Sequence, residues 1–272
     1  GIKRVVIGMI DPNPIVNGKG IEELREKGIE VEVGVLEEKA RKLNEAYAKF
    51  IKERVPFVIL KMAQSLDGKI ATKSGESKWI TGEKARRFVH KLRSECDAVL
   101  VGANTVLLDN PSLTAHGMGR DPKRIVLDGK GRVPPEAEVF RSGVERFVFT
   151  TKFSPSNWRK ALEERGVGVI VSEGEEVDIK GLLEELGKRG IASLLVEGGG
   201  ETAGAFLEAG MVDKILFFVA PIIIGGREAK TSVEGKGCQN LQEAVKLNYL
   251  NIRKLGNDIL IEAYPHYVHR NN

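Results

Sequence analysis

The sequence has few cysteines and no long hydrophobic run. Of its 272 residues only two are cysteines, Cys96 and Cys238, which lie too far apart to indicate a disulfide framework or a zinc knuckle. No stretch approaches the roughly 18 consecutive apolar residues of a membrane-spanning helix. The charged N-terminal residues are also unlike a signal peptide. These absences predict a cytoplasmic protein of a reducing compartment with no membrane attachment.

The chain also lacks a strong charge excess and the usual signatures of metal and nucleophile chemistry. A formal net charge of +4 disfavours a dedicated nucleic-acid binder. The sequence contains no H-E-x-x-H, C-x-x-C or G-x-S-x-G motif. His90 and His116 are isolated in the sequence, and His266 and His269 lie near the C-terminus. We therefore expect neither a metal site nor a dedicated nucleophile.

The chain does contain alternating strand-like and helix-like segments from residue 57 onward. Hydrophobic residues make up 42% of the sequence, which is enough for an ordinary globular core. The expected strands are 57–65, 97–102, 124–128, 146–150, 167–171, 192–197 and 214–224, and the expected helices are 82–94, 156–165, 178–189 and 201–210. A final hairpin, 246–254 and 258–264, would turn at Gly256-Asn257. This alternation predicts an α/β fold whose largely parallel sheet is covered by helices and made mixed by the hairpin.

A shorter N-terminal segment precedes this alternation. Its expected strands are 4–10 and 29–33, and its expected helices are 20–27 and 36–52. Pro56 would end the long second helix, which makes that helix the expected linker to the rest of the chain. The sequence begins without Met inside a strand-like run, so we expect it to be part of a longer polypeptide.

The strand expected at 57–65 has an unusual second face. Leu60 and Met62 belong to a face typical of a core, whereas the opposite face carries Lys61 and Ala63. Small side chains let a flat ligand approach the backbone, and the lysine adds a positive charge. This pattern indicates either a ligand-facing strand or an edge strand with a solvated lysine.

The segment GESKWITGEKARRFVHKLRSE combines a basic helix with a hydroxyl group and an indole ring. Arg86, His90 and Arg93 share one helical face because they are spaced four and three residues apart. Ser77 and Trp79 come directly before the helix. Together these groups are suited to hold a phosphorylated ligand and to stack on its ring. Such a basic stripe is also typical of a solvated helix face.

The segment LLVEGGGETAGAFLEAG places three glycines between a strand and a helix. Gly198, Gly200 and Ala203 fit the dinucleotide motif G-x-G-x-x-A, and such a loop can present backbone N–H groups to a phosphate. The acidic residue expected about 20 residues later in a Rossmann fold is absent, and the motif comes late in the chain. The loop therefore indicates either a phosphate site on another fold or a plain strand-to-helix turn.

These three stretches together resemble one enzyme family. LKMAQSLDGKIA, SGESKWITGEKARRFVHKLRSECDAVLVGANTVLLDNPSLT and LLVEGGGETAGAFLEAGMVDKILFFVAPIIIGG are similar to the reductase domain of the bifunctional riboflavin-biosynthesis deaminase–reductase. The resemblance covers residues 55–264, and S-x-W-I-T and D-x-P-x-L-T are its most specific motifs. It implies a dihydrofolate reductase-like mixed sheet flanked by helices.

The N-terminal segment resembles the end of the zinc deaminase domain of the same family, which is cytidine deaminase-like. The H-x-E and P-C-x-x-C motifs that hold zinc and the catalytic acid are absent. We therefore expect residues 1–53 to be a C-terminal remnant of the deaminase domain with a linker helix, and residues 54–268 to be the reductase domain. Zinc would belong only to a missing upstream part, and this chain would not deaminate.

The resemblance implies that NADPH reduces 5-amino-6-(5-phosphoribosylamino)uracil to its ribitylamino product, so the expected partner is a small phosphorylated pyrimidine. One alternative is another dihydrofolate reductase-like enzyme that acts on a pterin or a different aminopyrimidine. A second alternative is a non-catalytic flavin- or pyrimidine-binding regulator. The family commonly forms dimers, and the apolar strand KILFFVAPIII predicts a homodimer surface unless it is buried inside one sheet.

The resemblance also implies roles for individual residues. Positions that match cofactor contacts are Ala63, Trp79, Thr105, Asp109, Gly199, Gly200, Glu201, Thr202, Ala203, Gly204 and Ala205. Positions that match substrate contacts are Ser77, Arg93, Leu113, His116 and Glu197. Arg93 is the expected partner of the substrate 5′-phosphate. Lys61 and Glu197 are the expected catalytic residues for ring opening and proton transfer.

One position departs from the family pattern. His116 stands where the family commonly has a second phosphate-binding arginine. A neutral histidine is a weaker phosphate ligand, whereas a protonated one pairs with phosphate. Arg120, or the basic face at Arg86 and His90, is expected to compensate.

Overall fold

The structure, a computed structural model, describes residues 1–267 and divides into two compact units. The smaller unit comprises Gly1–Phe57 and Leu183–Ala192, and the larger comprises Val58–Leu182 and the chain from Ser193 onward. The expected boundary between residues 53 and 54 stays a prediction. Its end point at residue 268, like His269, lies outside the described residues.

The smaller unit contains a parallel strand pair and three helices. The strands are β1 (Arg4–Ile7) and β2 (Glu30–Val33), and the helices are α1 (Lys19–Glu26), α2 (Glu37–Leu43) and α3 (Glu45–Glu53). The single helix expected at 36–52 is wrong, because Asn44 separates α2 from α3. The Asn44 side chain donates a hydrogen bond to the Ala40 carbonyl at 2.8 Å, and asparagine often competes in this way with helical backbone bonding.

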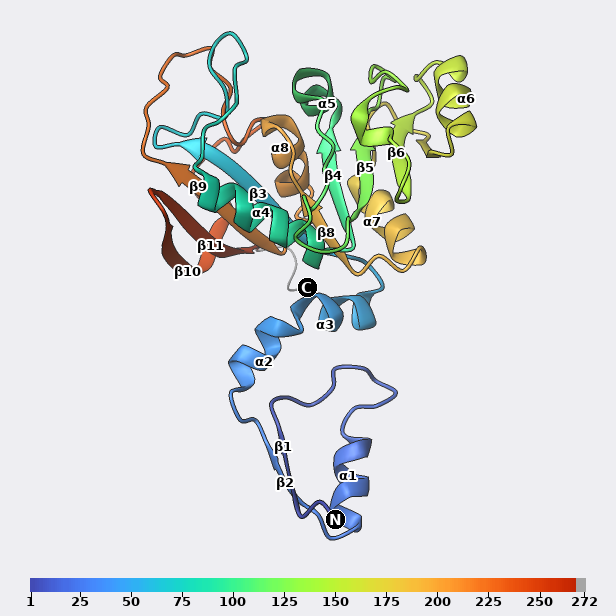
Figure 1. Ribbon diagram of the computed structural model, residues 1–272, viewed down its shortest axis with the longest axis vertical. Coiled ribbons are helices and arrows are strands. Elements are labelled where there is room, and N and C mark those ends of the chain that lie inside the picture. The colour runs from blue at the N-terminus through green and yellow to red at the C-terminus, as the bar shows by residue number, and fades with distance from the viewer. Residues whose placement is uncertain (268–272) are drawn as a thin grey trace. The chain divides into compact units, whose positions relative to one another are not determined.

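A mixed sheet of nine strands forms the larger unit within the described part of the chain. In chain order the strands are β3 (Phe57–Ser65), β4 (Ala98–Gly102), β5 (Lys123–Leu127), β6 (Arg146–Thr151), β7 (Gly168–Ser172), β8 (Ser193–Val196), β9 (Lys214–Ala220), β10 (Lys246–Leu255) and β11 (Asp258–His266). Across the sheet the order is β10-β11-β9-β3-β8-β4-β5-β6-β7 (Figure 1). Only the pairs made by the C-terminal hairpin are antiparallel among the pairs with a described register. The predicted hairpin and its turn at Gly256-Asn257 are therefore confirmed.

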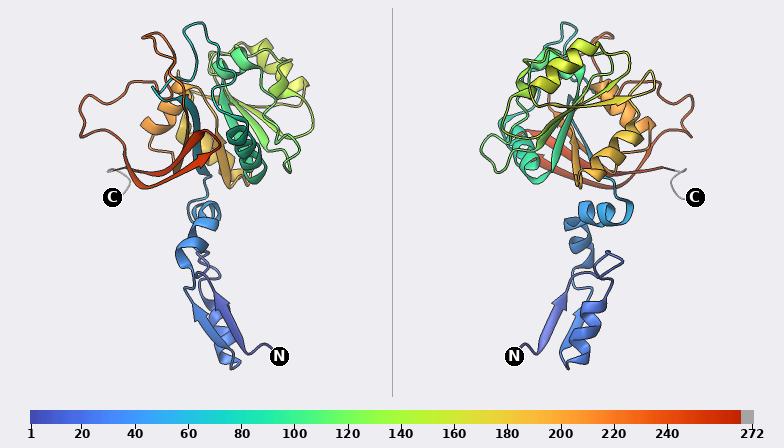
Figure 2. Two further views of the ribbon diagram at one scale, coloured as in Figure 1. Left: turned by 60° about the vertical axis from the view of Figure 1, so that its left-hand side comes forward. Right: turned by 90° about the vertical axis from the view of Figure 1, so that its right-hand side faces the viewer.

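The helices of the larger unit cover both faces of the sheet. They are α4 (Glu83–Glu95), α5 (Ala103–Asp109), α6 (Ser156–Glu164) and α8 (Gly200–Glu208), with a short 3₁₀ turn at Glu138–Phe140, and α7 (Ile179–Lys188) begins in the larger unit and ends in the smaller. Crossovers between parallel strands are almost always right-handed. Connections toward β7 therefore place α4 and α5 on one face, and connections back toward β9 place α7 and α8 on the other (Figure 2, right).

The first seven residues of the apolar segment KILFFVAPIII lie inside the sheet. They form β9, which pairs with β3 on one side and β11 on the other. Ile215, Leu216 and Phe218 are buried there, and the strand ends at Ala220, before Pro221, rather than at the expected residue 224. The alternative, burial inside one sheet, holds for Lys214–Ala220, whereas Ile222 and Ile223 beyond the strand are exposed. The expected homodimer stays a prediction.

Asp258 joins the C-terminal hairpin to the start of α4. The Asp258 residue is only 2% exposed, and its carboxylate accepts a 2.7 Å hydrogen bond from the backbone N–H of Gly82, the residue directly before α4. We expect Asp258→Ala to lower the free energy of unfolding by about 1–3 kcal/mol, because the Gly82 N–H loses its bond to a charged acceptor. Asp258→Asn keeps an acceptor oxygen and should lose less. Chemical denaturation of both variants tests this, and equal stability of wild type and Asp258→Ala would contradict it.

Candidate active site

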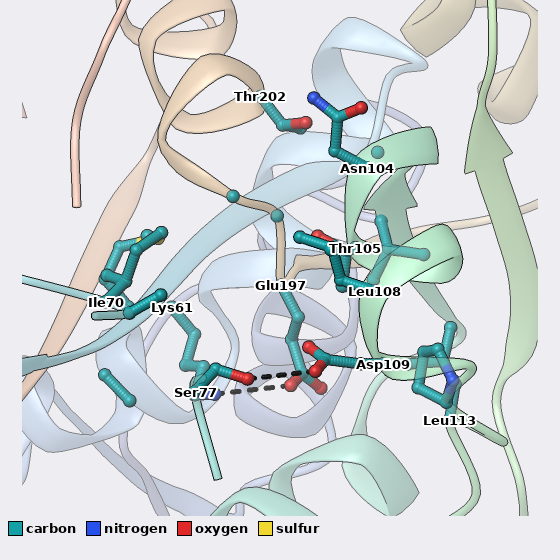
Figure 3. Close-up of a pocket in the computed structure, with 18 of the residues that line it drawn as sticks. Lys61, Ile70, Ser77, Asn104, Thr105, Leu108, Asp109, Leu113, Glu197 and Thr202 are labelled. Atoms are coloured by element: carbon teal, nitrogen blue, oxygen red, sulfur yellow. Dashed lines mark hydrogen bonds and ion pairs between the residues drawn. The ribbon is translucent and has the colours of Figure 1, made fainter. Parts of the chain in front are cut away.

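A cavity of about 900 Å³ opens at the carboxyl ends of β3, β8 and β4 in the larger unit. The connection from β3 leads in one direction across the sheet and the connection from β8 leads in the other. Ligands of open α/β sheets bind at such a point, because the loops diverge there and leave a crevice. Figure 3 shows side chains from these strand ends and from α5 and α8 converging on the cavity.

Lys61 enters this cavity from the middle of the sheet. Its strand, β3, lies between β9 and β8, so the alternative of an edge strand with a solvated lysine is excluded. Leu60 and Met62 are buried on the core side, as expected. Lys61 and Ala63 line the cavity, and the Lys61 side chain is 16% exposed. The second face of this strand is therefore cavity-facing, and its contact with a ligand stays a prediction.

Glu197 is held between two cations from distant parts of the chain. Its two carboxylate oxygens accept bonds from Arg93 Nε at 2.6 Å and Arg93 Nη2 at 3.0 Å, which is a bidentate pair. Lys61 Nζ also approaches Glu197 Oε2, at 3.4 Å (Figure 3). All three side chains are largely buried. We call Lys61, Arg93 and Glu197 the charged triad.

The electrostatics of the charged triad keep Glu197 ionised. Burial on its own would raise the pKa of the Glu197 carboxyl group. The charges of Arg93 and Lys61, and the hydrogen bonds that they donate, outweigh burial and lower this pKa to about 2. Glu197 therefore accepts hydrogen bonds at neutral pH and has no proton to give.

Arg93 has fewer unused N–H donors than an arginine that binds only phosphate. Besides its two bonds to Glu197, its Nη1 donates to the Thr114 carbonyl at 3.0 Å. A guanidinium group has five N–H donors, so two remain without a bond among the described residues. The expected role of Arg93 at the substrate phosphate stays a prediction, and it depends on these two donors.

The basic face of α4 forms one wall of the cavity rather than a solvated surface. Arg86, His90 and Arg93 all line the cavity. The guanidinium carbon of Arg86 lies 4.6 Å from the centre of the Trp79 ring, and Trp79 itself is 70% exposed. His90 stacks on His116, with ring centroids 4.2 Å apart. The stripe therefore faces the cavity, and its expected role in holding a ligand stays a prediction.

The helix α5 was not predicted, yet it carries two expected site residues. Thr105 and Asp109 lie on it, and Asp109 accepts a 2.9 Å hydrogen bond from Ser77 Oγ (Figure 3). Leu107 and Leu108 of the same helix are exposed. A short helix with exposed leucines lacks the periodic alternation of polar and apolar residues that indicates a helix, so the hydrophobic pattern does not predict α5. The strand end followed by V-G-A-N-T was the only local indication.

Close packing explains why glycine stands at most of the glycine positions around the loop between β8 and α8. A Cβ atom on Gly198 or Gly102 would lie 2.4 Å from Thr202 side-chain atoms, and one on Gly204 would lie 1.8 Å from the Glu234 carbonyl oxygen. Gly199 differs, because the nearest described atom to its Cβ position is Thr105 Oγ1 at 3.7 Å. Gly199 therefore leaves open space beside Thr105.

The start of α8 faces the cavity, whereas its second turn does not. In the described part of the chain the lining includes Gly198–Thr202 but not Ala203, Gly204 or Ala205. Ala203 is fully buried, and Gly204 packs on the Glu234 backbone. The expected cofactor contacts at these three positions have no support from the cavity geometry. Asn104, which the sequence reasoning missed, joins α5 to α8 by a 3.1 Å hydrogen bond to Glu201.

The remaining expected positions also lie around the cavity. Ala63, Ser77, Leu113 and His116 all line it. Within residues 1–267, no group of three or more His, Cys, Asp or Glu side chains is arranged to hold a metal ion. None of the helices in the same range is long and apolar enough to cross a membrane.

Comparison with known proteins identifies the family. The RibD C-terminal domain matches residues 56–261. The riboflavin biosynthesis protein RibD of Aquifex aeolicus is 42% identical over 263 residues, which are 96% of this chain and 72% of that protein. A 2,5-diamino-6-ribosylamino-4(3H)-pyrimidinone 5′-phosphate reductase of Methanothermobacter thermautotrophicus is 40% identical over 211 residues, which are 76% of this chain and 97% of that protein.

Solved structures agree with this family and with the expected fold. The diaminohydroxyphosphoribosylaminopyrimidine deaminase/5-amino-6-(5-phosphoribosylamino)uracil reductase from Thermotoga maritima superposes with a TM-score of 0.83 at 38% identity, over 98% of this chain and 72% of that chain. The expected α/β fold, a mixed sheet with helices, is confirmed. The chain belongs to the RibD family and is a pyrimidine reductase of riboflavin biosynthesis.

Proposed function

We propose that the chain reduces 5-amino-6-(5-phosphoribosylamino)uracil to 5-amino-6-(5-phosphoribitylamino)uracil with NADPH as the donor. The charged triad is the observation that carries this proposal. It places an ionised carboxylate and an ammonium group at the carboxyl edge of the sheet, between the glycine loop and the basic face of α4. A reaction that opens a sugar ring and moves one proton needs such a pair close to the reacting carbon.

The residues around the glycine loop fit a dinucleotide. The open space beside Gly199, the backbone N–H groups at the start of α8 and the Thr105 hydroxyl surround one end of the cavity. We propose that Ala63, Trp79, Thr105, Asp109 and Gly199–Thr202 hold NADPH. When bound, NADPH supplies the hydride, and the protein positions the substrate and handles the proton.

We propose distinct tasks for the two catalytic residues. Lys61 donates a proton to the sugar ring oxygen when the C1′–O bond breaks. Glu197 has no proton to give, and Arg93 is too strongly basic to release one, so Lys61 is the member of the charged triad suited to this step. Glu197 orients Lys61 through the 3.4 Å contact and accepts a hydrogen bond from a ribose hydroxyl group. Arg93 fixes Glu197 through its bidentate pair.

Trp79 provides a test of the cofactor proposal that does not depend on turnover. The sequence has two tryptophans, and Trp158 is buried with its Nε1 bonded to the Val133 carbonyl. We expect NADPH to quench Trp79 emission in a Trp158→Phe variant. We also expect Trp79→Ala to raise the Kd of NADPH about tenfold, or about 1.4 kcal/mol, because a stacking ring is lost. Trp79→Phe keeps a ring and is the matched control. Equal NADPH affinity in wild type, Trp79→Ala and Trp79→Phe would contradict the assignment.

The substrate is tested with a matched set of four compounds. They are the phosphoribosylamino uracil, the corresponding 2,5-diaminopyrimidinone, and each compound without its phosphate. We expect NADPH consumption with the phosphorylated uracil and little with either phosphate-free form. Faster turnover of the phosphorylated diaminopyrimidinone would instead give this chain the substrate named for the Methanothermobacter reductase. No turnover of any compound by folded, NADPH-binding protein would overturn the enzyme assignment.

We further propose that residues 1–53 correspond to the end of a deaminase domain and residues 54–268 to the reductase. The Thermotoga relative is named for both activities. This sequence contains no H-x-E or P-C-x-x-C motif, so zinc-dependent deamination is not a property of the present residues. We also propose a homodimer, which light scattering of the purified chain tests.

A further inference from the structure

The loop after β3 is paired with the segment after β9, and both extend beyond the carboxyl ends of these strands (Figure 1). We call residues 66–70 the β3 loop and residues 222–234 the strap. Lys69 of the loop and Thr231 of the strap form an antiparallel bridge. The residues beside this bridge exchange two backbone hydrogen bonds, from the Ile70 N–H to the Lys230 carbonyl at 2.9 Å and from the Ser232 N–H to the Gly68 carbonyl at 3.2 Å.

Asp67 joins the other end of the strap to the same loop. Its Oδ1 accepts a 3.0 Å hydrogen bond from the Ile224 N–H, and its Oδ2 accepts a 2.7 Å bond from the Gly225 N–H. The Ser65 hydroxyl group donates to Asp67 Oδ1 at 2.6 Å. The Ser65 bond, followed by the Ile224 bond, lowers the pKa of the Asp67 carboxyl group to about 2. An ionised carboxylate therefore connects the two segments at neutral pH.

Both segments contribute to the wall of the cavity. Ile70 of the β3 loop lines it (Figure 3), as do Lys230 and Glu234 of the strap. The Glu234 N–H also donates to the Gly200 carbonyl at 2.9 Å, at the start of α8. The strap thus contacts the glycine loop that is proposed to hold NADPH, and its position fixes one side of that loop.

We infer that Asp67 is a positioning residue for NADPH, which it affects through the strap and the β3 loop. Asp67 is not among the described residues that line the cavity, so it acts without touching the ligand there. The inference rests on the proposed function, since it concerns the cofactor of that reaction. Without the carboxylate, NADPH binding must also order the two segments, and this ordering costs affinity.

Calorimetric titration of NADPH into the full chain measures this cost. We expect Asp67→Ala to raise Kd by about 2- to 30-fold, the range typical of residues that act on a ligand without contact. The KM for NADPH should rise by a similar factor, whereas kcat at saturating NADPH should change less. Asp67→Asn keeps one acceptor oxygen, so its Kd should lie between those of wild type and Asp67→Ala.

Asp178 offers a matched control on the same unit. It is an exposed aspartate that accepts a 3.0 Å hydrogen bond from the Lys180 N–H, and it does not belong to the described lining of the cavity. Asp178→Ala also removes a carboxylate that accepts from the backbone. It should lower the melting temperature and leave the Kd of NADPH as in wild type.

A disulfide between the two segments separates positioning from stability. Lys69 and Thr231 are a pair of the non-hydrogen-bonded kind, because their neighbours make the flanking bonds. The Cα atoms of such pairs lie about 4.5 Å apart, within the span of a disulfide. Lys69→Cys and Thr231→Cys are combined with Asp67→Ala and with Cys238→Ser, which removes the exposed native thiol. The oxidised protein should bind NADPH nearly as wild type does, and the reduced protein as weakly as Asp67→Ala.

The outcomes distinguish this inference from the proposed function. Equal Kd of NADPH in wild type and Asp67→Ala overturns the role of Asp67 and leaves the reductase assignment intact. An oxidised cross-link that raises the melting temperature without restoring Kd also overturns it. Failure of the folded wild type to bind NADPH overturns the proposed function itself. Asp67→Asn and the oxidised protein carry the same test if Asp67→Ala does not fold.

Discussion

Replacement of Glu197 by glutamine is expected to lower kcat/KM by about 10²–10⁴-fold, the range typical of a lost acid–base or orienting group. The amide keeps the shape of the side chain but removes the charge that holds Arg93 and Lys61. Both cations then face each other in a largely buried space. Steady-state kinetics with the phosphorylated uracil measure the effect.

The loss of activity must be separated from a loss of stability. Removing one partner of a buried ion pair typically costs about 3–5 kcal/mol, so Glu197→Gln should also melt at a lower temperature. Adding Arg93→Met removes one of the two unpaired cations and should recover part of the stability but none of the activity. The exposed Glu164, paired with Lys160 on α6, offers a matched control, because Glu164→Gln should change neither property. Wild-type kcat/KM in Glu197→Gln would contradict the role of the charged triad.

Alanine at Gly204 is expected to destabilise the protein strongly. The new methyl group would lie 1.8 Å from the Glu234 carbonyl oxygen, and backbone cannot move aside as a flexible side chain can. Helix α8 must therefore shift away from the segment that packs on it. Overpacking of this kind costs about 1–3 kcal/mol and sometimes more. Thermal and chemical unfolding measure the loss.

Alanine at Gly199 is expected to leave stability unchanged and to weaken NADPH binding. Its methyl group meets only the Thr105 hydroxyl, at an ordinary 3.7 Å, and φ is −70°, which any residue adopts. Stability should therefore match wild type, whereas the methyl group occupies space proposed for NADPH. We expect the Kd of NADPH to rise about tenfold, equivalent to about 1.4 kcal/mol. If Gly199→Ala binds NADPH as wild type does, the cofactor lies elsewhere in the cavity.

Local sequence pattern was enough to locate most elements of the larger unit. Burial alternates with period two from Leu60 to Ala63 of β3, and Gly256-Asn257 marks the hairpin turn, so both were predicted from neighbouring residues alone. The pattern failed where local and tertiary effects compete. Asn44 divides an amphipathic stretch by bonding to the Ala40 carbonyl, and α5 leaves its leucines exposed.

The sequence by itself determined the family, most of the strands and helices along the chain, and the residue types available for chemistry. Its motifs also marked Lys61, Arg93 and Glu197 as site residues before any contact among them was known. Only the tertiary structure decided that these three form one charged triad, since Glu197 lies 104 residues from Arg93 and 136 from Lys61. The physical reason is the strand order: β8 inserts beside β3, and this long-range pairing brings the three charges together at one edge of the sheet.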